Sequence, residues 1–178
     1  AISPSGMDYF KLEPSDIVVM DLDGNVVDGK RKPSSEYEMH SIFYRERKDI
    51  LSVGHGHSTY SSILACLNWG IEPCSYLIGS AGGNVRCTKY ETFGTYELAQ
   101  SALEGMKDRY AVLLGNHGLL AGGEDLPTAF DNAEEIEFCA EIYYKCKLAG
   151  NPVLLSDEQL AEVLRKFAVY GVQPEVDE

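Results

Sequence analysis

The feature that most constrains the fold of this chain is the spacing of three histidines. His55 and His57 stand two residues apart after one apolar run, and His117 follows a second apolar run far along the chain. Residues 50–53 and 111–114 are each predicted to be short buried strands. Because side chains two apart on a strand point to the same side, His55 and His57 are expected to project together. A fold that also brings His117 to the same side would place three imidazoles close together.

Three imidazoles with one open position are typical of a catalytic zinc site. Imidazole also suits iron, copper, cobalt and nickel, so the pattern predicts a metal centre without fixing the metal. A histidine beside a turn often has only a hydrogen-bonded structural role, and for His117 alone that is the simpler interpretation. The pair together with a third histidine favours metal binding. The fourth histidine, His40, lies in a predicted helix without such a partner and is expected to be structural.

A second feature is the start of a predicted helix over residues 35–47. Pro33 is followed by Ser34, Ser35 and Glu36, which predicts that one serine is the N-cap and that Glu36 lies in the first turn. Unsatisfied N–H groups and the helix dipole make such a start favourable for anions. The hydroxyls therefore suit either capping or phosphate binding. Glu36 alone could simply complement the dipole.

The remaining pattern indicates an α/β layered domain. We expect a hairpin over 16–28, a strand near 76–79 followed by a loop to 84, and four helices besides the one at 35–47. Those helices are predicted at about 58–68, 95–106, 126–148 and 156–169, the last opened by a capping box. Hairpins mixed with helices predict a mixed, largely antiparallel sheet. With 178 residues, the chain is expected to form a single domain over 1–178.

Charge and hydropathy exclude some classes of partner. The chain has 28 acidic and 15 basic residues, a net charge of −13, which argues against a nucleic-acid surface. We expect no membrane span, because no stretch approaches about 20 apolar residues. The cytoplasm is the expected location. An anionic ligand would have to bind through a few local donors.

Five segments carry a resemblance to the class II aldolase/adducin family. They are ISPSG at 2–6, KPSSE at 32–36, HGHS at 55–58, ETFGT at 91–95 and NHG at 116–118. The resemblance extends from the first residue to about Gly171 and is greatest to the L-fuculose-phosphate aldolase branch. The histidine pair with the preceding Ser-Ser-Glu is its specific part. Members of the family have an upstream stretch that contributes an asparagine to the phosphate pocket, and an amino-terminal stretch is therefore expected to be missing before Ala1.

The resemblance implies a three-layer α/β/α fold and a role for each matching residue. One Zn²⁺ per chain would be held by three histidines and a carboxylate, which are His55, His57, His117 and Glu36. Glu36 would also be the base that removes a proton from the substrate. The phosphate would lie at Ser5, Gly6, Ser34 and Ser35. Tyr76 would handle the aldehyde oxygen, and Tyr170 matches a mobile carboxy-terminal tyrosine.

The implied reaction is the reversible cleavage of a ketose 1-phosphate, L-fuculose 1-phosphate, to dihydroxyacetone phosphate and L-lactaldehyde through a metal-stabilised enediolate. The resemblance also implies a homotetramer with sites between subunits. Alternatives within the family are a pentulose-phosphate 4-epimerase, a dehydratase or a non-catalytic adducin-like binding module. Epimerases typically carry aspartate at the position of Glu36 and a second aspartate near residues 76–81, where this chain has none. A closed structural zinc site is a further alternative.

Overall fold

Four strands form the central sheet of the computed structural model, which describes residues 1–170. Their order is β3 (Ser52–Gly56), β6 (Gly118–Gly123), β5 (Ala111–Leu114) and β4 (Arg86–Cys87). The pairs β3–β6 and β5–β6 are antiparallel, whereas β4 and β5 are parallel. The predicted mixed, largely antiparallel sheet is therefore confirmed. The end of the predicted domain, and Gly171 at the end of the resemblance, lie outside the described residues.

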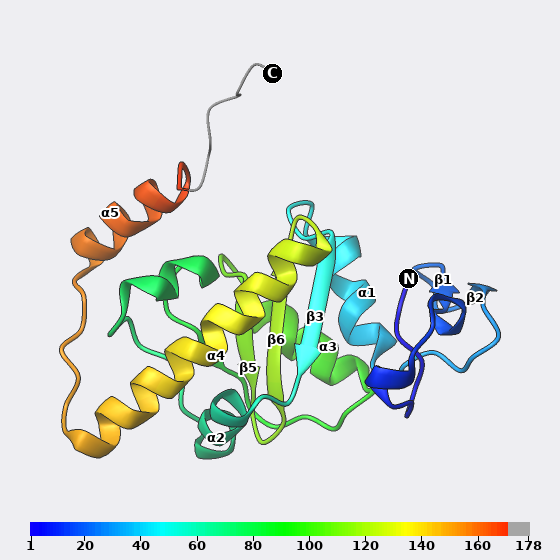
Figure 1. Ribbon diagram of the computed structural model, residues 1–178, viewed down its shortest axis with the longest axis horizontal. Helices are drawn as coiled ribbons and strands as arrows, with labels where there is room; N and C mark the ends of the chain where they lie inside the picture. Colours follow the sequence, from blue (N-terminus) through cyan, green and yellow to red (C-terminus); the bar gives the residue numbers. More distant parts are fainter. Residues whose placement is uncertain (171–178) are drawn as a thin grey trace.

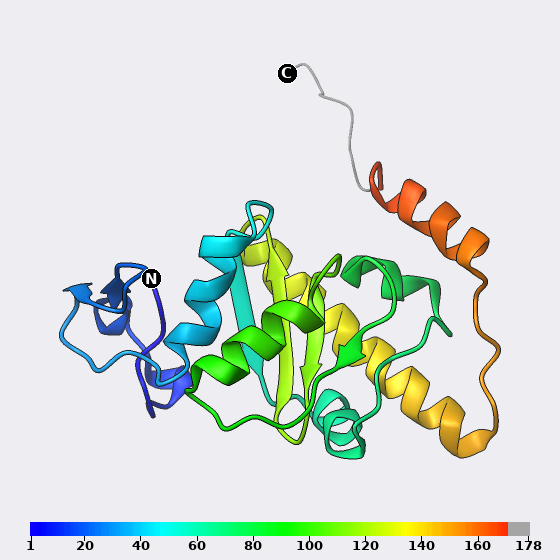
Figure 2. The same cartoon turned by 180° about the vertical axis from the view of Figure 1, so that it is seen from behind.

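Helices cover both faces of this sheet. On one face lie α2 (Thr59–Leu67) and the long α4 (Leu126–Ala149), and on the other lie α1 (Tyr37–Glu46) and α3 (Tyr96–Gly105), as Figures 1 and 2 show from opposite sides. The three-layer α/β/α architecture is therefore confirmed. Each predicted helix is found with its ends within two residues of the predicted bounds. None of the helices among residues 1–170 is both long and apolar enough to cross a bilayer.

The two layers pack through alternating side chains of the central strands. On β5, Leu113 belongs to the buried cluster under α2 and α4, whereas Val112 and Leu114 belong to the cluster under α1 and α3. On β6, Leu119 and Leu120 divide in the same way. All five side chains are at most 3% exposed. Since both faces are buried, these strands are apolar throughout and hold the sheet rigidly between the helices.

Smaller elements flank the layers. The predicted hairpin is found as β1 (Val19–Met20) and β2 (Val26–Asp28), near the 3₁₀ helices η1 (Tyr9–Lys11) and η2 (Pro14–Asp16). At the other end, α5 (Asp157–Phe167) stands apart from the sheet (Figure 1). Its capping box is present, with Ser156 and Gln159 bonded to each other's backbone N–H groups, and this part of the prediction is confirmed.

The predicted strand at 76–79 is wrong, because these residues begin the 3₁₀ helix η3 (Tyr76–Ala81). The Ser75 hydroxyl accepts a hydrogen bond from the Leu77 N–H, and Gly82 ends the helix with a φ of 80°. A short apolar run is compatible with either structure, and here the cap and the glycine decide.

Strand β3 also lies about two residues later than predicted, and β4 and β6 were not predicted. Strand β6 is rich in glycine because its neighbours approach closely. A Cβ at Gly118 would lie 2.5 Å from the Gly56 carbonyl oxygen, and one at Gly122 would lie 3.0 Å from the Ile50 side chain.

Candidate metal centre

The pairing of β3 with β6 brings the three histidines together. His55 lies on β3 and His57 follows its last residue, while His117 lies in the tight turn between β5 and β6. His55 pairs with Leu120 across the ladder, so the turn before β6 lies beside the end of β3. Asn116 adopts a left-handed conformation in that turn, with a φ of 54°, as short polar side chains tolerate. The predicted convergence of the histidines is found.

The ligand atoms of the three imidazoles all lie within 4.8 Å of one another. The ring of His55 is 4.8 Å from each of the other two rings, centroid to centroid. The carboxylate of Glu36 joins them, with Oε2 3.2 Å from His55 Nε2 and Oε1 3.5 Å from His117 Nε2. The four predicted ligands thus form one cluster at the end of the sheet.

The hydrogen bond of His55 fixes which of its nitrogens can bind a metal. Its Nδ1 lies 2.8 Å from the Leu119 carbonyl oxygen, which can only accept, so Nδ1 carries a proton and Nε2 is the nitrogen that faces Glu36. Among residues 1–170, both His55 Nε2 and Glu36 Oε1 are buried without a hydrogen-bond partner. Because nitrogen and oxygen atoms of the types that bind metals face one another here, two of them without a hydrogen-bond partner, the donor set fits a divalent cation.

The pKa values favour the ligating forms of these groups. Burial lowers the pKa values of His57 and His117, and the neighbouring His55 lowers them further, although Glu36 acts in the opposite direction. Burial acts to raise the pKa of Glu36, but the three imidazoles outweigh it and hold that pKa below its usual range. Neutral imidazoles and an ionised carboxylate are the forms that bind metals.

The predicted cap of α1 needs correction. The helix begins at Tyr37, so Glu36 occupies the N-cap position and does not lie in the first turn. Its side chain makes no capping hydrogen bond, while its own N–H donates to the Ser34 hydroxyl at 3.2 Å. The carboxylate is turned toward His55 and His117 and away from the N–H groups of the helix end.

A cavity of about 380 Å³ opens beside the cluster. It is lined by Glu36, His57, Tyr90, Glu91, Phe93, Asn116 and His117. Sequence reasoning assigned no role to Tyr90, Glu91, Phe93 or Asn116. A signal was present for three of them, because Glu91, Phe93 and Asn116 lie in the segments ETFGT and NHG that carry the family resemblance.

The residues predicted to hold phosphate lie on two paired segments. The Ser5 N–H donates to the Lys32 carbonyl at 2.9 Å, and the Ser34 N–H donates to the Ser3 carbonyl at 3.0 Å. Gly6 turns the chain with a φ of 68° immediately after this pairing. The segment that carries Ser5 and Gly6 therefore lies beside the segment that carries Ser34 and Ser35. The second of these segments leads directly to Glu36.

The two predicted tyrosines are not brought to the cluster within this chain. Tyr76 in η3 is 58% exposed and Tyr170 is 81% exposed. Each ring centroid lies 6.2 Å from that of Phe167 in α5. Neither tyrosine is among the residues that line the cavity beside the histidines. Their roles stay predictions.

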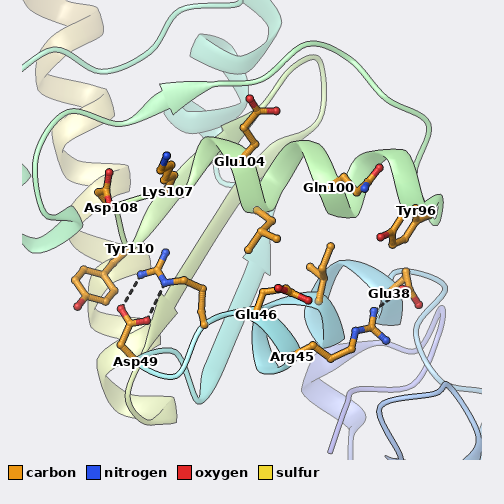
Figure 3. A pocket seen from close by; sticks show the side chains of 13 residues that line it. Glu38, Arg45, Glu46, Asp49, Tyr96, Gln100, Glu104, Lys107, Asp108 and Tyr110 are labelled. Carbon is orange, nitrogen blue, oxygen red and sulfur yellow. Dashed lines mark hydrogen bonds and ion pairs between the residues drawn. The ribbon is translucent and has the colours of Figure 1, made fainter.

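A larger hollow, about 1100 Å³, lies elsewhere, between α1 and α3 (Figure 3). It contains none of the predicted site residues. Arg45 is paired with Glu38 at 2.5 Å and Arg47 with Asp49 at 2.7 Å, so both guanidinium groups already have carboxylate partners. The smaller cavity, in contrast, adjoins Glu36, His57 and His117.

Comparison with known proteins adds four findings. Residues 1–144 match the family model of the class II aldolase and adducin N-terminal domain. A 5-deoxy-D-ribulose 1-phosphate aldolase of Bacillus thuringiensis serovar kurstaki is 54% identical over 97% of this chain and 81% of its own. An L-fuculose phosphate aldolase of Escherichia coli K12 is 40% identical over 98% and 81%. A solved L-fuculose 1-phosphate aldolase has a TM-score of 0.91 at 49% identity, over 93% of this chain and 78% of its own.

Proposed function

Because the chain belongs to the class II aldolase and adducin family, we propose that it is a zinc-dependent aldolase that reversibly cleaves a deoxyketose 1-phosphate. The products would be dihydroxyacetone phosphate and a short aldehyde. The first candidate substrate is 5-deoxy-D-ribulose 1-phosphate, since a relative named for it is 54% identical. L-fuculose 1-phosphate, the substrate implied by the sequence, is the second candidate, because the solved enzyme of that name is 49% identical.

The observation that carries the proposal is the convergence of Glu36 with three imidazoles beside an open cavity. A cation held by His55, His57, His117 and Glu36 would supply Lewis-acid stabilisation of the negative charge that develops on the substrate oxygens. A non-catalytic scaffold has no need of buried nitrogen and oxygen atoms without hydrogen-bond partners, such as His55 Nε2 and Glu36 Oε1.

Glu36 has the properties of the base. Its pKa lies below its usual range, so the carboxylate is ionised at neutral pH and can accept a proton. In the condensation direction we assign to it the removal of one hydroxymethyl proton of dihydroxyacetone phosphate, which yields the enediolate. In the cleavage direction the same carboxyl group returns that proton. Ser5, Gly6, Ser34 and Ser35 are assigned to the phosphate.

The aldehyde half of the reaction is assigned to a neighbouring subunit. Tyr76 would donate a proton to the aldehyde oxygen during condensation, and Tyr170 would close over the site. This proposal of a homotetramer with sites between subunits is supported by the exposure of both tyrosines and by their absence from the lining of the cavity. Sedimentation analysis of the purified protein should give a tetramer, and a catalytically active monomer would contradict the assignment.

The test begins with metal and substrate. Elemental analysis should find about one zinc per chain, and removal of the metal with a chelator should abolish activity that added Zn²⁺ restores. Production of dihydroxyacetone phosphate is then compared for 5-deoxy-D-ribulose 1-phosphate and L-fuculose 1-phosphate. Zinc-loaded protein that cleaves neither compound, or that only epimerises a pentulose phosphate, would refute the aldolase proposal. The predicted cytoplasmic location is tested separately by cell fractionation.

A further inference from the structure

The start of α2, which follows His57 directly, is capped by a residue from another helix. Ser58 is the N-cap residue, yet its side chain accepts no hydrogen bond from the first turn. Glu137 of α4 takes that role. One carboxylate oxygen accepts the Tyr60 N–H at 2.7 Å, and the other accepts the Ser61 N–H at 2.8 Å and the Ser58 hydroxyl at 2.7 Å. Three donors at the start of α2 are thus bound to one side chain.

These contacts are strong for electrostatic reasons. A carboxylate at a helix N-terminus faces the positive end of the helix dipole and accepts charge-assisted hydrogen bonds. Ser58 is of the residue type that usually caps a helix with its own oxygen. Here its hydroxyl donates to Glu137, so the start of α2 is tied to α4, which packs on the sheet through the buried Ile136 and Ala140.

His57 lies between two fixed points. On one side, Gly56 pairs with Leu119 at the end of the β3–β6 ladder. On the other side, Ser58 is bound to Glu137. Gly118 leaves room for the ring, since a Cβ there would lie 3.0 Å from His57 Cδ2. The backbone on both sides of His57 is therefore held in place.

His55 and His57 differ in how their rings are aimed. The His55 ring is oriented by the hydrogen bond from its Nδ1 to the Leu119 carbonyl. Within residues 1–170, the His57 ring has no such hydrogen-bond partner, although metal-ligating histidines usually have one. The direction of the His57 ring therefore depends on its backbone and on the neighbouring imidazoles, since it stacks on His117 with ring centroids 5.1 Å apart.

We propose that Glu137 is a positioning residue of the metal centre, which holds the start of α2 so that His57 points at the metal. The inference rests on the metal centre proposed above. Glu137 touches neither substrate nor metal in this role. It acts through Ser58 and the first turn of α2. Its loss should lower the affinity for the metal strongly and the stability of the fold only weakly.

The test measures Co²⁺ binding to metal-free protein by competition with a chromophoric chelator, together with the visible absorption of bound Co²⁺. Glu137→Gln keeps the size of the side chain but loses one accepting oxygen. We expect about a 10-fold to 100-fold loss of Co²⁺ affinity, the scale of removing a group that orients a ligand, and a changed Co²⁺ spectrum. Glu134→Gln, one turn earlier on an exposed position of α4, should bind Co²⁺ as the wild type does.

Thermal unfolding of the metal-free variants separates positioning from simple capping. A Glu137→Gln protein with a lowered unfolding temperature but unchanged Co²⁺ affinity and spectrum would overturn the inference while leaving the metal centre intact. If Glu137→Gln does not fold, Ser58→Ala carries the test. It removes one of the three contacts and should lower Co²⁺ affinity several-fold, and unchanged affinity would again overturn the inference. A wild type that binds no Co²⁺ would refute the metal centre and this inference together.

Discussion

Two regions of the molecule, both assigned to the active site, differ in how completely a single chain assembles them. We call them the metal end and the tyrosine end. The metal end consists of Glu36 and the three histidines, which come from separate segments of the chain. The ligand atoms of the three imidazoles all lie within 4.8 Å of one another. The tyrosine end, which is Tyr76 with Tyr170, is exposed and packs around Phe167. The difference teaches that the fold of one chain is sufficient to gather the predicted metal ligands, but does not bring the predicted tyrosines to them.

The largest expected effect concerns the base at the metal end. Glu36→Gln should slow the exchange of a hydroxymethyl hydrogen of dihydroxyacetone phosphate with deuterated water by about 10² to 10⁴, the range for removing a general base. NMR measures this exchange without any aldehyde. The variant should retain most of its zinc, since three histidines remain. Glu38→Gln, on the same helix but paired with Arg45, is the control that should exchange normally. Full exchange in Glu36→Gln would assign the base elsewhere.

Mixing two inactive variants tests whether the two ends meet between subunits. His57→Ala loses the metal, and Tyr76→Phe loses the proposed proton donor but should keep hydrogen exchange. In tetramers formed from equal amounts of the two variants, about one site in four would combine an intact metal end of one subunit with an intact Tyr76 of the neighbouring subunit. We expect activity to return to about that fraction.

The matched control is a mixture of His57→Ala with Glu36→Gln. Both changes lie at the same metal end, so no arrangement of these two subunits gives an intact site. Equal recovery in the two mixtures, or none in either, would show that Tyr76 does not serve the metal of a neighbouring chain.

The same contrast separates what the sequence could predict from what it could not. Helices with local signals were predicted well, such as the one opened by Ser156 and Gln159. The histidine cluster was predicted from its spacing, although the strand that assembles it was not. Strand β6 is buried on both faces and contains three glycines, so it has neither alternation nor strand propensity. The Glu137 contact spans 79 residues and has no local signal at all.

A smaller effect, on the stability of the folded protein, is expected at His40. Burial and the neighbouring His55 lower the pKa of His40 to about 4, against the opposing influences of Glu36 and the Val53 backbone. The unfolded chain, with an ordinary pKa near 6.5, therefore binds more protons than the folded protein between these values. Stability of the metal-free protein should fall as the pH drops through this window. From pH 7 to pH 5 the contribution of His40 amounts to about 2 kcal/mol.

Denaturant unfolding at a series of pH values measures this contribution as a difference. His40→Gln cannot take up the proton, so its free energy of unfolding should depend less steeply on pH between 5 and 7 than that of the wild type. The other histidines and the carboxylates titrate in both proteins and cancel in the comparison. Parallel pH profiles would show that His40 is not held neutral by the fold.

The smallest effect is expected at the tyrosine end, where a methyl group can separate η3 from α5. A Cβ at Gly79 would lie 2.3 Å from the Phe167 ring and 3.0 Å from Val163, so Gly79→Ala must displace the Phe167 ring and loosen the packing of α5 on η3. Because α5 has no buried residue, the global unfolding free energy should change by only about 1 kcal/mol. Amide hydrogen exchange of α5 should nevertheless accelerate, while Co²⁺ binding at the metal end stays unchanged. Gly150→Ala, which adds a methyl group into open space, should alter neither. If Gly79→Ala weakened Co²⁺ binding, the two ends would be coupled within one chain, and the division between them would have to be abandoned.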